Sequence, residues 1–198
     1  MRLKLISLLG VALLATACGG DNEERKNETS IEEAKKPEDL GARARNGNLD
    51  RGGMGVTSED LNNDGTPDQW TLSGAGGSVE RIERDLNFDG KTDLWQYPDG
   101  SGLVLEEEMD LDHDARVDVV VYYRPDGSIE HKELAIEFSN KFTVYKYYDE
   151  AGELQRIEQD EDANSVIDRW DYYQNKRIVR TGYDDDGDGL PDRFEKVK

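Results

Sequence analysis

The sequence has few of the residues that cross-link or stiffen a chain or that act in catalysis: one cysteine, two histidines and five prolines occur in 198 residues. A single cysteine excludes a disulfide within the chain, so the fold must be held together by something else. The histidines, His113 and His131, have no partner that indicates a nucleophilic triad or a zinc site. Carboxylates are abundant, but nothing in the sequence singles out a pair as the general acid and general base of an enzyme. We therefore expect no enzymatic activity, and an enzyme that uses some of these carboxylates is the weakest hypothesis.

Basic residues are also scarce. The chain has 25 Lys and Arg against 45 Asp and Glu, a net charge of −20. This balance argues against nucleic acid as a partner, because phosphates are bound by Lys and Arg, and it suits cations instead. Only 35% of the residues are hydrophobic, so we expect a thin core or a single-layered sheet.

Only one long apolar run is present, Leu5–Leu14, and it follows the basic residues Arg2 and Lys4. Ten residues are too few to span a bilayer, which takes about 20. Small residues and a cysteine come next, Ala15-Thr16-Ala17-Cys18. The segment resembles a bacterial lipobox with Ala15 in place of the usual leucine, and a signal peptide cut elsewhere is the alternative.

The lipobox resemblance implies a signal peptide over residues 1–17 and a lipidated Cys18 that anchors the protein to a membrane. Gly19 rather than aspartate follows the cysteine, which in such lipoproteins implies the outer membrane; periplasmic and surface exposure both stay open. Residues 18–58 are polar and poor in aromatic residues, which predicts a flexible tether after the lipidated cysteine. The remaining residues, 59–198, are predicted to form the folded domain.

A repeat fills that domain. Its units start at Asp60, Asp85, Asp110, Ala135, Asp160 and Asp184, in steps of 25, 25, 25, 25 and 24 residues. A fixed period of this kind indicates stacked supersecondary units, and it argues against a disordered acidic chain.

Each unit reads as a β-hairpin. Apolar residues alternate after each acidic stretch, as in Trp95 and Tyr97, which is the period of a half-buried strand. A turn such as Pro98-Asp99-Gly100 follows, in which glycine accepts a positive φ. We predict an all-β fold of about eleven strands, an antiparallel meander in a single twisted or curled sheet, with a closed barrel as the alternative.

The acidic stretches have the pattern D-x-[DN]-x-[DN]-G-x-x-D. Calcium takes six to eight oxygen ligands at about 2.3–2.6 Å, and this spacing offers side-chain oxygens at positions 1, 3, 5 and 9. The predicted side-chain ligands are Asp60, Asn62, Asp64, Asp68; Asp85, Asn87, Asp89, Asp93; Asp110, Asp112, Asp114, Asp118; Asp160, Asp162, Asn164, Asp168; and Asp184, Asp186, Asp188, Asp192. Backbone carbonyls at position 7 would come from Thr66, Lys91, Arg116, Val166 and Leu190.

These loops resemble the calcium loops of FG-GAP/VCBS repeats, and the last resembles EF-hand and thrombospondin type 3 loops, with Glu195 as a possible bidentate ligand. The resemblance covers the loops and not the architecture, because a propeller blade has four strands and an EF-hand has helices. Further oxygens could come from water or from Glu83, Glu108 and Glu158, each two residues before a loop. Solvated acidic turns without an ion are the alternative.

The copies are unequal. Position 6 is Ala115 and Ser165 in two loops, and a residue with a Cβ is strained at positive φ, so we expect weaker sites there. The fourth unit has Ala135, Glu137, Ser139 and Thr143 at the ligand positions and should bind no ion. Its strand residues Tyr145 and Tyr147 are nevertheless kept, which indicates that the loop acids serve an ion rather than the sheet.

The function expected from these patterns is that of a non-enzymatic binding or scaffolding module on the cell envelope, stabilised by calcium. Its partner would be another envelope protein or a polysaccharide. The alternative is a carbohydrate-binding surface protein that uses an aromatic stripe, Trp70, Trp95 and Trp170 with nearby tyrosines.

Overall fold

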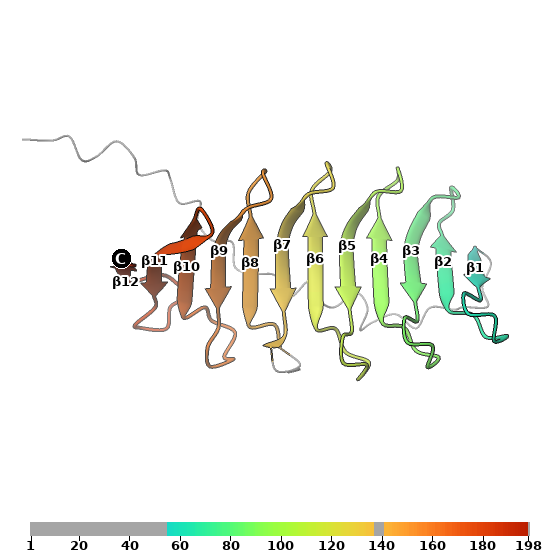
Figure 1. Cartoon of the computed structure of the whole chain (residues 1–198), viewed down its shortest axis with the longest axis horizontal. Coiled ribbons are helices and arrows are strands. Elements are labelled where there is room, and N and C mark those ends of the chain that lie inside the picture. Colours follow the sequence, from blue (N-terminus) through green and yellow to red (C-terminus); the bar gives the residue numbers. More distant parts are fainter. Residues whose placement is uncertain (1–54, 137–140, 198) are drawn as a thin grey trace, which may run out of the picture. The chain divides into compact units, whose positions relative to one another are not determined.

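The computed structural model describes residues 55–136 and 141–197, and its twelve strands form one antiparallel sheet (Figure 1). Strand order follows chain order, so the predicted all-β meander is confirmed. The strands are β1 (Val56–Glu59), β2 (Gln69–Ser73), β3 (Val79–Arg84), β4 (Leu94–Pro98), β5 (Val104–Met109), β6 (Val119–Tyr123), β7 (Ile129–Leu134), β8 (Val144–Tyr148), β9 (Leu154–Gln159), β10 (Arg169–Gln174), β11 (Arg177–Tyr183) and β12 (Arg193–Lys196).

The sheet has one strand more than the sequence predicted. This strand is β1, which pairs with β2 from Val56↔Leu72 to Glu59↔Gln69 and lies partly in the range assigned to the tether. The sheet is open, since β1 and β12 are the two ends of its strand order, so the alternative of a closed barrel does not hold for the described residues.

Two kinds of connection alternate along the sheet. The acidic loops join each odd-numbered strand to the next even-numbered strand at one end of the strands, here called the loop edge, which is the lower side in Figure 1. Short hairpin turns join even-numbered to odd-numbered strands at the opposite end. Positive φ in the hairpin turns falls on Gly77, Gly102, Gly127 and Gly152, and on Asn175 and Lys176 in the turn after β10. The turn after β4 thus uses Gly102 rather than the predicted Gly100.

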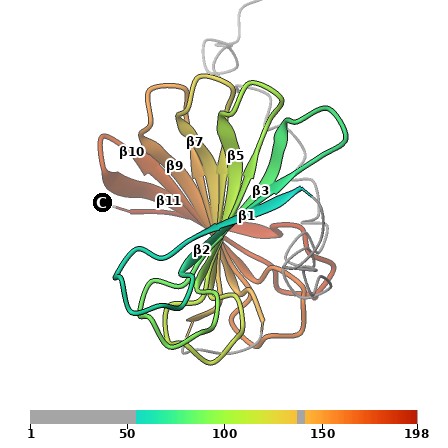
Figure 2. The same ribbon diagram turned by 90° about the vertical axis from the view of Figure 1, so that its right-hand side faces the viewer.

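The sheet is twisted, and a repeated irregularity accompanies the twist. A register shift occurs near the turn in all five hairpins, for example between Tyr97 and Pro98 and between Tyr147 and Tyr148. Such bulges increase the local right-handed twist. In the view along the sheet, successive strands fan out around the axis (Figure 2).

The strand register places equivalent repeat positions in rows across one face of the sheet. The first row, here called the Glu row, is Trp70, Glu83, Trp95, Glu108, Val120, Glu133, Tyr145, Glu158, Trp170, Gly182 and Phe194. The aromatic stripe named above, with Trp70, Trp95 and Trp170, therefore lies in one row, but a glutamate from the intervening strand separates one ring from the next along most of it. Val120, Glu108 and Glu158 are at most 1% exposed, so this row is the centre of the thin core.

The second row on the same face lies two residues closer to the hairpin turns. This Tyr row is Tyr97, Glu106, Tyr122, His131, Tyr147, Arg156, Tyr172, Arg180 and Lys196. Its side chains stack on one another: the rings of Tyr122 and His131 are 4.1 Å apart, and Arg180 lies 4.4 Å from the centroids of both Tyr172 and Phe194. Cross-strand pairs of this kind stabilise a sheet that has no second layer in the described residues.

Candidate metal sites

The first and ninth residues of each acidic loop hold the loop in one conformation. In the loop 85–93, the carboxylate of Asp85 accepts hydrogen bonds from the backbone N–H groups of Phe88 (2.7 Å) and Gly90 (2.6 Å). Asp93 closes the loop by accepting from Leu86 (2.7 Å). Equivalent bonds to the first and ninth acids recur in the loops that begin at Asp60, Asp110, Asp160 and Asp184.

The backbone of each loop turns twice through the left-handed region. Position 6 has a positive φ in every loop, at Gly65, Gly90, Ala115, Ser165 and Gly189. Position 4 does so too, at Asn63, Phe88, His113, Ala163 and Gly187. The positive φ at position 6 was predicted from its glycines, whereas that at position 4 was not, because Phe88 and Ala163 are residue types that rarely adopt this conformation.

Acidic side chains converge in three loops. Ligand oxygens of three acids lie within 4.8 Å of one another in the sets Asp110, Asp112, Asp118; Asp160, Asp162, Asp168; and Asp184, Asp186, Asp192. Two oxygens on opposite sides of a calcium ion are roughly 4.6–5.2 Å apart, so these clusters could hold a metal ion. The loops 60–68 and 85–93 carry Asn62 and Asn87 at position 3 and share the same loop hydrogen bonds.

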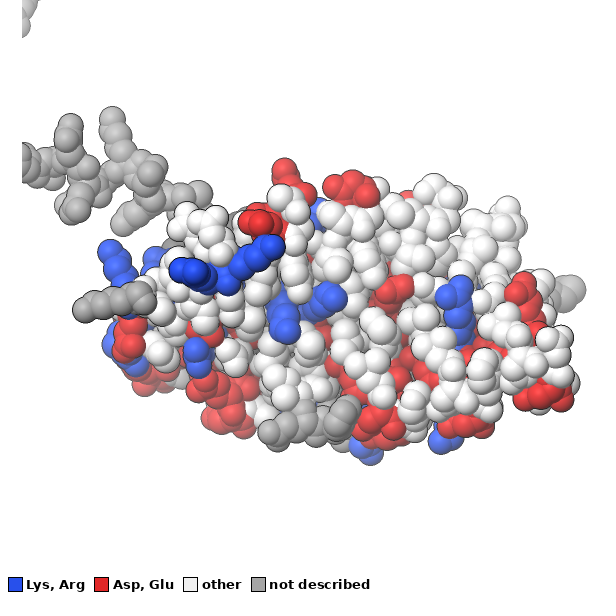
Figure 3. Space-filling model, viewed as in Figure 1, with Lys and Arg blue, Asp and Glu red and all other residues white. Residues whose placement is uncertain are grey.

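Burial and clustered charge raise the pKa of two loop acids, whereas hydrogen bonds from the loop backbone lower the pKa of Asp64. Burial raises the pKa of Asp118, and the nearby carboxylates of Asp112 and Asp110 add to the effect. Asp192 and Asp188 raise the pKa of Asp186. Figure 3 shows Asp and Glu gathered along the loop edge of the sheet. A divalent cation at this edge would relieve the repulsion among these groups.

In four loops, the side chain at position 5 accepts a hydrogen bond from the backbone N–H at position 7. The N–H groups of Thr66, Lys91, Val166 and Leu190 donate to the fifth residue of their loops, Asp64, Asp89, Asn164 and Asp188. In the remaining loop, the guanidinium of Arg116 lies 3.1 Å from Asp114. The residues predicted to supply carbonyl ligands are thus held close to the position 5 side chains.

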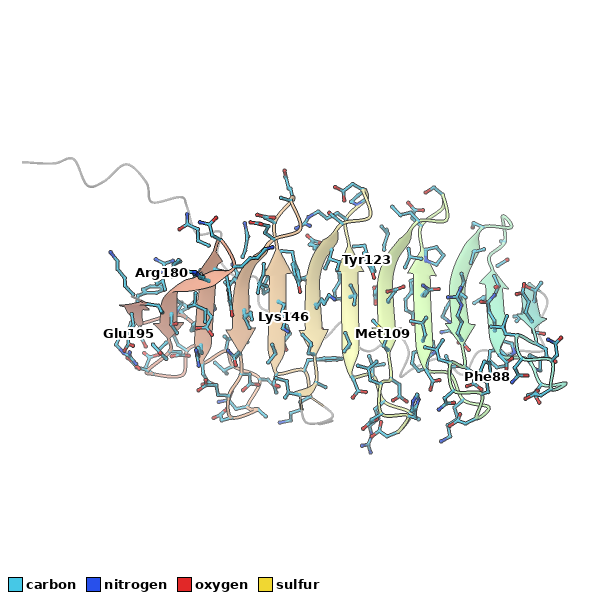
Figure 4. All side chains as sticks on the ribbon, in the orientation of Figure 1. Phe88, Met109, Tyr123, Lys146, Arg180 and Glu195 are labelled. Atoms are coloured by element: carbon cyan, nitrogen blue, oxygen red, sulfur yellow. The ribbon has the colours of Figure 1, made fainter. Side chains whose placement is uncertain are left out.

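Four residues named above as predicted or possible calcium ligands lie on strands, outside the acidic loops. Glu195 is on β12 (Figure 4), opposite Thr181, and pairs with Arg193. Alternation along the strand places it on the other sheet face from Phe194. Glu83, Glu108 and Glu158 are in the Glu row, each at most 3% exposed. Arg81 lies 2.7 Å from Glu83, and Arg156 lies 2.8 Å from Glu158. Their carboxylates take part in the packing of the sheet face.

The repeat also contains a sequence signal for this buried row. Glu83, Glu108, Glu133 and Glu158 recur every 25 residues, and Arg81, His131 and Arg156 precede three of them by two residues. Alternation in a strand puts residues i and i+2 on one face, so a basic residue two positions before a glutamate indicates an ion pair within the sheet.

A side-chain contact links the neighbouring loops 85–93 and 110–118. Nδ1 of His113, at position 4 of its loop, lies 2.9 Å from Oδ1 of Asp93, the last acid of the preceding loop. This hydrogen bond raises the pKa of His113. Asp93 is a predicted metal ligand, so an ion that bound this oxygen in the loop 85–93 would compete with His113 for it.

The fourth unit keeps its sheet contacts without the acids. The N–H of Ala135 donates to Asp118 O, and the N–H of Asp160 donates to Thr143 O, as the first acids do elsewhere. Glu137 and Ser139 lie outside the described residues, and so do the predicted signal peptide, Cys18 and most of the predicted tether. The part of the chain that the structure describes contains no helix long and apolar enough to cross a membrane.

The fold and the loops define a single-sheet repeat protein with acidic loops along one edge. No family model matches the sequence, and no curated protein does either. Structural similarity is low, with TM-scores of 0.40 to the GtfA/B complex bound to UDP and GlcNAc (13% identity, 52% of this chain and 22% of that chain) and 0.39 to accessory secretory proteins 1, 2 and 3 of Streptococcus pneumoniae (10% identity, 61% and 22%). A TarM structure from S. aureus gives 0.31 at 10% identity, over 63% of this chain and 21% of that one. The chain spans about a fifth of these proteins' length.

Proposed function

We propose that this chain is a lipid-anchored scaffolding or binding module of the cell envelope whose sheet is stabilised by calcium in its acidic loops. The observation that carries the proposal is the loop conformation itself, which recurs wherever the loop acids are present. The fourth unit keeps the same strand pairing with Ala135 at the first position. The strand pairing does not need the acids, and the convergence of three carboxylates within one loop supports a cation as their ligand.

All-oxygen donors favour calcium over softer metals. If a site binds at about 10⁻⁴ M and calcium is present at about 2 mM, each occupied site adds about 1.8 kcal/mol to the free energy of unfolding. The expected role is therefore structural: ions neutralise the loop edge and hold consecutive strands in one sheet. The membrane partner would be reached through Cys18, and the net charge of −20 argues against nucleic acid as a partner.

The test is calorimetric titration with calcium of the mature chain, made without lipid through Cys18→Ser and first stripped with EGTA. We expect four or five bound ions and a melting temperature that rises with calcium. Asp110→Asn combined with Asp118→Asn should remove one ion. Asp126→Asn, in an exposed hairpin turn, is the matched control and should remove none. Equal melting temperatures with and without EGTA, together with no detectable ion, would refute the proposal.

Carbohydrate binding through the aromatic side chains is the second candidate function. The arrangement of the rows limits which rings could contact a sugar. Trp70 and Trp170 are 7% and 2% exposed, which leaves little ring surface for a sugar. Trp95 and the tyrosines of the Tyr row are only half-buried and remain the candidates for such contacts. Tryptophan fluorescence titrated with polysaccharides should shift if Trp95 contributes, and no shift with any glycan would remove this candidate.

A further inference from the structure

The two ends of the sheet are complementary to each other. Throughout the sheet, an even-numbered strand is followed by an odd-numbered strand in one register, which pairs Trp70 with Glu83 and Tyr145 with Glu158. The last strand, β12, is even and the first strand, β1, is odd. A second copy placed with its β1 beside β12 would continue the alternation without interruption.

The register of this junction follows from the five that exist. In β10 and β11, Arg169 pairs with Tyr183 and Trp170 with Gly182. Arg193 and Phe194 occupy the places of Arg169 and Trp170 in β12, while Glu59 and Ser58 occupy those of Tyr183 and Gly182 in β1. The junction would therefore pair Arg193 with Glu59, Phe194 with Ser58, Glu195 with Thr57, and Lys196 with Val56.

The backbone groups agree with this register. Ser73 N–H donates to Gly55 O, so residues 55, 57 and 59 point their polar groups toward β2, and residues 56 and 58 point theirs outward. Val197 N–H donates to Val179 O, so residues 194 and 196 of β12 point outward. The proposed register brings these two outward sets together, with Phe194 opposite Ser58 and Lys196 opposite Val56.

Side chains at the junction are complementary as well. Arg193 and Glu59 are opposite charges at directly paired positions, which stabilises a sheet. Glu195 opposite Thr57 repeats the pair Asp171 and Thr181, in which the threonine Oγ1 donates to the aspartate at 2.8 Å. Phe194 is 42% exposed, whereas Trp170, the residue at the same repeat position, is 2% exposed beside β11. A neighbouring strand would cover Phe194.

We propose that copies of this chain associate head to tail, with β12 of one copy pairing antiparallel with β1 of the next in the register Arg193↔Glu59. The contact is heterologous: the two copies use different surfaces, so each copy keeps one end available for another. The expected product is a continuous ribbon of sheet whose length depends on protein concentration. This inference concerns the strand edges and does not depend on calcium in the loops.

The first test is sedimentation velocity of the mature chain with Cys18→Ser across a range of concentrations. The chain should form a concentration-dependent series of oligomers. Glu59→Arg or Arg193→Glu alone should shift the series to monomer by placing like charges opposite each other, and the two substitutions together should restore it. Glu150→Arg, an identical charge change in a hairpin turn, is the control and should leave the series unchanged.

The second test fixes the register. Directly paired residues have Cα atoms about 5.5 Å apart, within the range that a disulfide can bridge. Ser58→Cys with Phe194→Cys in the same chain should give a ladder of oxidised multimers, whereas Ser58→Cys with Glu195→Cys, on the wrong face, should not. A monomer at every concentration, single charge reversals that leave the oligomers intact, or equal cross-linking of the two cysteine pairs would overturn the proposal.

Discussion

The guanidinium of Arg156 lies over the ring of Tyr147, 4.4 Å from the ring centroid. The same side chain reaches Glu158 in the Glu row, with Nε 2.8 Å from Oε1. Burial raises the pKa of Glu158, and the charge and hydrogen bonds of Arg156 counteract this rise. One arginine therefore connects the two rows of the sheet face and supports a carboxylate that is 1% exposed.

Removing this arginine should be costly. Arg156→Met leaves the buried Glu158 without its cation, and we expect the free energy of unfolding to fall by about 3 kcal/mol. Urea denaturation followed by circular dichroism measures the change. Adding Glu158→Met to the same chain should recover most of the loss, because no buried charge then remains. Arg177→Met, an exposed change on β11, should cost less than about 0.5 kcal/mol.

Backbone strain in the loops gives a second prediction, tested by reciprocal variants. Ala115 has φ 69° at position 6, where Gly65 has φ 96° in the first loop. Ala115→Gly should stabilise the chain by about 1 kcal/mol, and Gly65→Ala should destabilise it by 1–2 kcal/mol, roughly the cost of a Cβ at positive φ. A Cβ at Gly65 would have no heavy atom within 4 Å, so the effect is one of the backbone alone.

In each variant, calcium affinity should change in the same direction as stability. If the loop must adopt this conformation to bind an ion, calorimetry should show tighter binding for Ala115→Gly and weaker binding for Gly65→Ala. Unchanged stability and affinity in both variants would mean that the left-handed conformation is not strained here.

The half-buried tyrosines predict a loss of stability at alkaline pH. Burial raises the pKa of Tyr97 and Tyr147, and the nearby carboxylates of Glu108 and Glu158 raise it further. A group whose pKa is raised in the folded state stabilises below its unfolded pKa, about 10 for tyrosine. That stability is lost as the pH rises through the folded value.

Tyrosinate absorbance during a pH titration checks this expectation. Tyr97 and Tyr147 should titrate above pH 10 and together with unfolding, and Tyr147→Phe should remove one late-titrating group. If all tyrosines titrated near pH 10 in a chain that stayed folded, the packing of the Tyr row would be contradicted.

Gly182 allows a fourth prediction, because it stands where other repeats have a buried glutamate. A Cβ on Gly182 would lie 2.9 Å from Cε1 of Phe194 and 3.2 Å from Cβ of Pro191. Gly182→Ala should displace the Phe194 ring and loosen β12, at a cost of about 1–2 kcal/mol. Hydrogen exchange at the amides of β12 is the measurement. Gly76→Ala is the control, since a Cβ there would meet no heavy atom within 4 Å.

Much of this fold could be predicted because the same pattern of strand, turn, strand and acidic loop repeats several times in the sequence. The alternation around Trp95 and Tyr97 recurs at each unit, so strands, turns and loops could be assigned from their spacing. The strand β1 escaped prediction because Val56–Glu59 has no strong alternation, and its pairing with β2 is what makes it a strand. Whether the sheet closes depends on twist accumulated over many strands, which no local pattern records.

More of the acidic loops could be predicted than of the sheet face that carries the Glu row. Asp85, Asn87, Asp89 and Asp93 are ligand types at recognisable spacing, whereas the positive φ of Phe88 contradicts the preference of its residue type. The buried glutamates were misplaced for a related reason. A glutamate two residues before a calcium loop suggests a ligand, and only the strand register shows that Glu108 lies between Trp95 and Val120.

The meander order also determines how the chain can fold and how its length can change. Each strand makes its main contacts with the strands next to it in the sequence, so few contacts wait for distant segments to meet, and folding can start at any hairpin and spread in both directions. Deleting or duplicating one 25-residue block would leave the contacts of the other blocks intact. Tandem duplication in the gene could therefore lengthen the protein gradually, and thermal melting should proceed by fraying from the two outer strands.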